Sequence, residues 1–145
     1  MAARRDLRPF IYLALDVLCV VVYAIVIVEV IPNRLPSAAV QLWSLPACML
    51  VMAIGTAGIF RPALRGRGRW VAIAGGSLLL ASTIVIIARV LVSAAFLAGV
   101  YGAFGKAAAT FALVAIALVV ELVAILPLVQ VKYLMSRAGR RAYAP

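Results

Sequence analysis

Ionisable side chains in the middle of long apolar stretches are the residues of this chain that could do chemistry. The sequence contains only four acidic residues, and three of them, Asp16, Glu29 and Glu121, lie within apolar segments together with Arg89. An ionisable group inside a membrane segment costs about 2.5–3.5 kcal/mol on insertion scales, so such groups usually pair or line a cavity. These four residues are therefore the candidate site residues.

Arg89 and Glu121 are predicted to form a buried ion pair. The segments that contain them are joined by a short glycine-containing connection, so they should form an antiparallel hairpin. Counted from the tip of that hairpin, the two residues differ in height by about 4–5 Å at 1.5 Å per residue, which an arginine side chain can bridge. We expect this pair to hold the two helices together.

Asp16 is the candidate proton or cation site, because no second basic residue lies at its depth in the chain. It is either protonated, joined to Arg89 and Glu121 in a cluster, or in contact with water or a partner chain. Glu29 is a weaker candidate, since it lies 13 residues after Asp16, which rotates it by ~140° away from the face of Asp16. Its position beside Arg34 favours the outer membrane surface.

The residue types exclude most kinds of catalytic and metal site. The chain has no histidine, which removes histidine-bound haem, histidine-based metal sites and a histidine general base. Cys19 and Cys48 both lie in apolar segments without C-x₂-C spacing, so we expect neither to bind metal. No base lies beside a serine or threonine in a nucleophile motif. We therefore expect no enzyme activity, no cofactor and no metal.

Four apolar segments must position these residues. The chain has 145 residues, of which 68% are hydrophobic, well above the ~45–50% apolar content of soluble globular proteins. About 20 apolar residues cross a ~30 Å hydrocarbon core as a helix. The sequence thus predicts one all-α membrane domain, residues 1–145, with four transmembrane helices in two antiparallel hairpins, at about residues 10–31, 38–60, 70–100 and 106–134.

Basic residues gather on one side of these predicted helices. Eleven Lys and Arg residues lie at the two ends of the chain and in the loop 61–69, whereas only Arg34 and Lys106 lie in the other two connections. The positive-inside rule then predicts a multi-pass protein of the plasma (bacterial inner) membrane whose two termini both lie in the cytoplasm. We expect the loop 61–69 to be non-helical and to contact lipid head groups, not nucleic acid. The arginines that make this contact are Arg61, Arg65, Arg67 and Arg69.

The second segment presents small residues to its neighbours. Gly55 and Gly58 lie beside Ala53 and Ala57, and such residues let membrane helices approach closely. Together with the missing catalytic groups, this favours an accessory or assembly subunit, or a self-associating scaffold, in a membrane complex. The alternative is a small oligomeric transporter or channel for a proton, cation or organic ion that uses Asp16 and the Arg89–Glu121 pair. A weaker third hypothesis is a lipid-interacting protein.

Overall fold

The protein is built from helices, and the described residues contain no strand. The computed structural model describes residues 6–30 and 36–144. Side chains are described for most of these, but not for residues 30, 36–41 and 115–122. The elements are α1 (Arg8–Ile25), the π-helical turn η1 (Val26–Val30), α2 (Pro36–Ala57), the 3₁₀ turns η2 (Gly58–Phe60) and η3 (Pro62–Leu64), α3 (Arg65–Val100), α4 (Gly102–Met135) and α5 (Arg137–Ala142).

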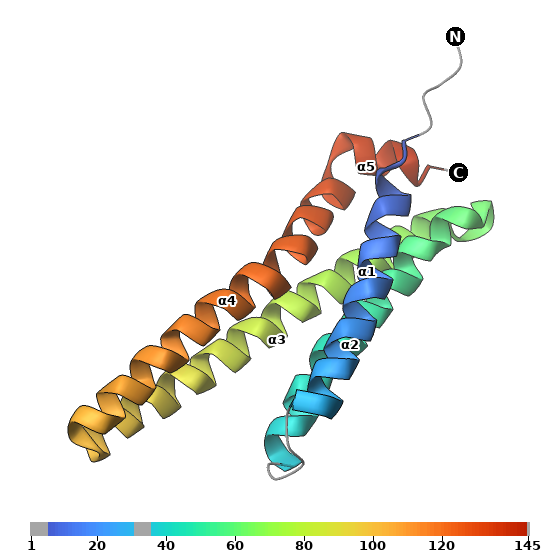
Figure 1. The fold of residues 1–145 in the computed structure, drawn as a ribbon. Coiled ribbons are helices and arrows are strands. Elements are labelled where there is room, and N and C mark those ends of the chain that lie inside the picture. The colour runs from blue at the N-terminus through green and yellow to red at the C-terminus, as the bar shows by residue number, and fades with distance from the viewer. Residues whose placement is uncertain (1–5, 31–35, 145) are drawn as a thin grey trace.

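The long helices form two hairpins that share one end of the molecule. α1 packs against α2, α2 against α3, and α3 against α4 over most of its length. The start of α1, the α2–α3 connection and α5 meet at one end, whereas the far ends of the two hairpins diverge (Figure 1). We call the shared end, formed by residues 6–8, 58–69 and 133–144, the basic end.

The predicted all-helical fold is confirmed, and three helical stretches are long and apolar enough to cross a membrane. These are Arg8–Glu29, Leu42–Phe60 and Pro62–Val100. α4 is a continuous helix whose described parts, Gly102–Val114 and Val123–Met135, are also apolar. The observed helices overlap all four predicted segments.

The basic loop 61–69 departs from the prediction, because all of its residues except Arg61 are helical. Residues 62–64 form a 3₁₀ turn, and α3 begins at Arg65 and not near residue 70. The first turn of a helix lacks intrahelical partners for its N–H groups, so other contacts must help to hold it in place. Arg65 does so by donating from Nε to the carbonyl of Ile59 at 3.1 Å.

Glycines bring α2 and α3 into backbone contact next to the basic end. A Cβ added at Gly55 would meet the backbone nitrogen of Ala72, and one added at Gly68 would lie 2.6 Å from the carbonyl oxygen of Gly55. A Cβ at Gly75 would lie 2.7 Å from the backbone nitrogen of Met52. This confirms that small residues of the second segment make a close helix contact, and it fixes how α2 and α3 are rotated toward each other.

The core lies in the half of the molecule nearer the basic end. One cluster of buried residues joins α2, α3 and α4, and consists of Leu45, Met49, Met52, Leu79 and Val123. A second cluster at the basic end consists of Ala72, Tyr133, Leu134 and Tyr143. Cys19, Val20 and Tyr23 of α1 pack against the first cluster. Farther along α3, side chains such as Val92 and Phe96 are exposed, at 71% and 67%.

Candidate functional site

Asp16 is completely buried between helices, about two turns from the start of α1. Its exposed fraction is 0%, and that of Gln130 on α4 is also 0%. Thr56, in the last turn of α2, is 1% exposed. Three helices that are far apart in the sequence thus bring one polar side chain each to the same point. We call Asp16, Thr56 and Gln130 the polar cluster.

Hydrogen bonds join all three members of the polar cluster. The Gln130 Nε2 amide donates to Asp16 Oδ2 at 2.8 Å and to Thr56 Oγ1 at 3.0 Å, which uses both of its N–H groups. Thr56 Oγ1 lies 2.9 Å from the Met52 carbonyl and 3.5 Å from Asp16 Oδ2. A hydroxyl has one proton, and the shorter distance assigns it to Met52, so Gln130 is the principal donor to Asp16.

Two acceptor oxygens of the polar cluster have no donor. Asp16 Oδ1 and Gln130 Oε1 are buried and have no hydrogen-bond partner among the described residues, and the same holds for the hydroxyl of Tyr23, about two turns farther along α1. A buried polar atom without a partner costs about 1–3 kcal/mol. Among the described residues, the only salt bridge joins Arg8 to Asp6 at 4.0 Å, so no described cation neutralises Asp16.

Tyr143, the residue that follows the C-terminal helix α5, contacts the polar cluster at Thr56. Tyr143 is 2% exposed, and its hydroxyl donates to the Thr56 carbonyl at 3.2 Å. Thr56 lies where α2 ends, and the last carbonyls of a helix lack regular intrahelical donors. Burial raises the pKa of Tyr143 to about 12, so this hydroxyl keeps its proton at neutral pH.

Side chains around the basic end hold α5 in this position. Arg69 Nη1 donates to the Leu134 carbonyl at 3.2 Å, and Arg65 Nη1 donates to the Ala144 carbonyl at 3.4 Å. Ser136 caps α5 by accepting from the Gly139 N–H at 3.2 Å. Gly139 lies so close to the end of α4 that a Cβ would meet the Tyr133 carbonyl. α5 is therefore docked by several independent contacts.

The predicted lipid-contacting arginines of the loop 61–69 fall into two groups. Arg61 and Arg67 are exposed and free to meet head groups, whereas Arg65 and Arg69 are half-buried and bond to carbonyls of the protein. Arg69 also lies over the Trp70 ring, with its guanidinium carbon 4.9 Å from the ring centre. Part of the basic charge therefore serves the docking of α5.

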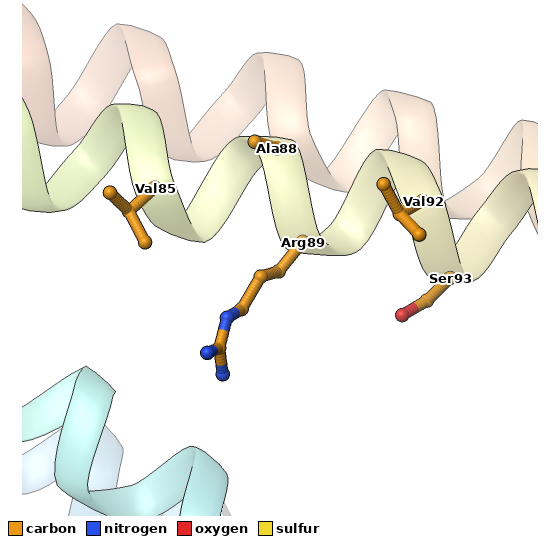
Figure 2. Close-up of a pocket in the computed structure, with 5 residues that line it drawn as sticks. All are labelled: Val85, Ala88, Arg89, Val92 and Ser93. Carbon is orange, nitrogen blue, oxygen red and sulfur yellow. The ribbon is translucent and has the colours of Figure 1, made fainter.

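Arg89 lies on the diverging part of α3 and points away from α4. Its side chain is exposed and lines an open pocket of about 410 Å³ with Val85, Ala88, Val92 and Ser93 (Figure 2). It has no ion pair or hydrogen bond with any described side chain. Glu121, its predicted partner, belongs to α4, but the Glu121 side chain lies outside the described residues. The predicted ion pair therefore stays a prediction.

Glu29 is exposed in the π-helical turn η1, which follows α1, and its expected position at the outer membrane surface stays a prediction. It lies outside the polar cluster. Asp16 is buried whereas Arg89 is exposed on α3, and no salt bridge joins them among the described residues. The expected cluster of Asp16 with Arg89 and Glu121 also involves Glu121, whose side chain lies outside the described residues.

Sequence reasoning missed Thr56, Gln130 and Tyr143. The available signal was the presence of a hydroxyl and an amide inside apolar segments, since polar side chains in such segments commonly bond across helices. Searching only for charged partners directed attention to Arg89 and away from Gln130. Tyr143 follows a stretch of basic residues, which is typical of a solvated tail. The sequence around Tyr143 therefore gave no indication that its side chain is buried.

Comparisons of the chain with protein-family models, with curated proteins and with solved structures return no match. Its function must therefore be argued from the arrangement of its own residues. Two features carry that argument: the enclosed polar cluster near the basic end, and the exposed Arg89 on the diverging part of α3.

Proposed function

We propose that this chain is a non-catalytic, multi-pass protein of a bacterial inner membrane that acts as a self-associating scaffold or accessory subunit. In this proposal α1 to α4 all cross the membrane and the basic end faces the cytoplasm. The apolar helices and the one-sided distribution of Lys and Arg support this placement. The absence of histidine from the sequence and the enclosure of Asp16 support a role without catalysis.

The exposed Arg89 is the observation that carries the proposal. An arginine on a membrane-spanning helix is costly unless it finds a counter-charge or reaches the head groups. The residues around it on the same face include Ser82 and Ser93, and small hydroxyl side chains favour close contact between membrane helices. This face of α3 therefore suits a helix that carries a carboxylate.

A second copy of this chain supplies such a helix. Glu29 is exposed in η1, which follows α1, and it lies about 32 Å along the helix axis from Arg8 at the basic end. Arg89 lies about 28 Å along α3 from Trp70, the first residue beyond the basic end. The opposite charges thus lie at similar distances along their own helices, and we infer that two copies side by side in one membrane bring them together. We propose Arg89–Glu29 contacts between copies.

Charge reversal tests this contact. In mild detergent and in liposomes, Arg89→Glu and Glu29→Arg should each weaken self-association by about tenfold or more, since each places like charges together. The double variant should recover most of the loss, because it restores opposite charges. Self-association is measured by energy transfer between fluorescently labelled copies.

Arg67→Glu is the matched control, because Arg67 is an exposed arginine at the basic end and should leave self-association unchanged. A wild-type protein that copurifies with a different membrane protein through Arg89 would favour an accessory subunit over a self-associating scaffold. A wild-type protein that stays monomeric and without partners in both media would contradict the proposal.

A further inference from the structure

The two oxygens of the Asp16 carboxyl group are in different surroundings. Oδ2 accepts a hydrogen bond from the Gln130 amide at 2.8 Å and has Thr56 Oγ1 at 3.5 Å, whereas Oδ1 is buried with no partner in the described part of the chain. In a neutral carboxylic acid, one oxygen accepts hydrogen bonds and the other carries the proton and donates. We propose that Asp16 and Gln130 form a binding site for a single proton, held on Asp16 Oδ1.

The charges around the site fit a neutral acid. Among the described residues, the titratable groups that interact electrostatically with Asp16 include Cys19 on α1 and Tyr143, which follows α5, with Tyr23 beside Cys19, and none of these three is a cation. α2 and α4 contribute the neutral Thr56 and Gln130. A buried carboxylate with no positive neighbour is strongly disfavoured, and binding a proton removes its charge.

The proton also improves the hydrogen bonding of the cluster. It converts Oδ1 from an acceptor without a donor into a donor, and the unpartnered Gln130 Oε1 is an acceptor held in the same cluster. A proton on Oδ1 thus removes one unpartnered acceptor from the cluster and supplies a donor near a second one. The structure therefore favours the protonated form through its geometry as well as its charge.

A metal ion fits this site less well. Calcium takes six to eight oxygen ligands and magnesium takes six, many of them charged or water. The polar cluster offers two unpartnered oxygens, and the described residues contain no group of three or more His, Cys, Asp or Glu side chains that could hold a metal. A proton needs only one oxygen and one acceptor.

Tyr143 is buried, and its hydroxyl donates to the Thr56 carbonyl at 3.2 Å. We expect this contact to slow the entry of water to the polar cluster from the basic end. The site goes beyond the scaffold role proposed above, and it is also the site that proton transport would need. The experiment therefore detects the proton itself, so its failure leaves the scaffold proposal standing.

Infrared spectroscopy of the wild-type protein in lipid nanodiscs detects the proton directly. A protonated carboxyl group has a C=O stretching band that a carboxylate lacks. The chain contains only two aspartates, Asp6 and Asp16, so ¹³C labelling of aspartate side-chain carboxyls marks these two groups alone. We expect a protonated-carboxyl band at neutral pH that moves to lower frequency when the aspartates are labelled. The glutamates are unlabelled, so they contribute nothing to the shifted band.

Two variants assign the band. Asp16→Asn should abolish it, and Asp6→Asn, which changes the other labelled group, should leave it unchanged. Tyr143→Phe should speed the exchange of the band into deuterated buffer by about two- to tenfold, the effect of losing one hydrogen bond of ordinary strength. The proposal is overturned if labelled wild-type protein has no such band at neutral pH, or if the band survives in Asp16→Asn.

Discussion

At the scale of single residues, Gln130 decides the surroundings of Asp16. Its amide uses one N–H on Asp16 and the other on Thr56, so one side chain of α4 connects α1 and α2. Hydrogen bonds between membrane helices contribute about 0.6 kcal/mol on average and up to about 1.7 kcal/mol. The larger effect comes from losing an acceptor, because the stranded donor stays buried.

Thr56→Val tests this bond against a matched control. Thr56 and Thr83 are both buried, and both donate to the carbonyl four residues earlier, Met52 and Leu79 respectively. Only Thr56 accepts from Gln130. Thr56→Val should therefore lower the free energy of unfolding by about 1–3 kcal/mol more than Thr83→Val. Unfolding in detergent measures the difference, and equal losses would mean that the Gln130 bond contributes no stability.

At the scale of helices, the α2–α3 contact places Thr56 next to Gln130. Gly55 precedes Thr56, and a Cβ at Gly55 would meet the backbone of Ala72 on α3. This close approach fixes the rotation of α2, so that Thr56 faces Asp16 and Gln130 while Ile54, on the opposite side, is 61% exposed. The polar cluster therefore depends on a glycine that takes no part in its chemistry.

Gly55→Ala and Gly99→Ala should change stability in opposite directions. A methyl group at Gly55 forces two helix backbones apart, and overpacking of this kind costs about 1–3 kcal/mol. Nothing lies within 4 Å of a Cβ at Gly99, so alanine there should stabilise α3 by up to about 1 kcal/mol. Thermal unfolding in detergent compares the two. A Gly55→Ala protein as stable as wild type would show that α2 and α3 can separate at no cost.

At the scale of the whole molecule, the two ends differ in charge and in packing. The basic end is tightly closed: Tyr133 donates to Asp6 at 2.8 Å, and Arg65 reaches the Ala144 carbonyl. The far ends of the two hairpins diverge, and α3 and α4 continue as a pair with exposed apolar faces (Figure 1). The closed end suits the cytoplasmic surface, and the open end suits contacts with other helices in the membrane.

Cysteine labelling tests the orientation proposed for the molecule. In a background with Cys19→Ala and Cys48→Ala, a cysteine is introduced either at Tyr101, 59% exposed at the α3–α4 turn, or at the exposed Ala144. An impermeant maleimide should label Tyr101→Cys in intact bacterial spheroplasts and Ala144→Cys only after permeabilisation. The reverse pattern would place the basic end outside and contradict the positive-inside assignment.

The sequence by itself determined the helices and singled out Asp16. Apolar runs of this length and composition form helices in any arrangement, and an acidic residue inside such a run is conspicuous without knowledge of its neighbours. The glycines of the second segment also predicted a close contact. The sequence was wrong about the loop 61–69, because the contacts that stabilise the start of α3 come from residues outside it, such as Ile59.

Only the tertiary structure decided which side chains surround Asp16. Helix rotation and pairing follow from backbone contacts between distant segments, such as Gly55 with Ala72, and no local pattern specifies them. The same contacts bring Gln130 to Asp16, leave Arg89 on an exposed face, and allow α5 to fold back so that Tyr143 covers Thr56. The sequence supplied the buried acid, and the packing of four helices around it supplied its partners.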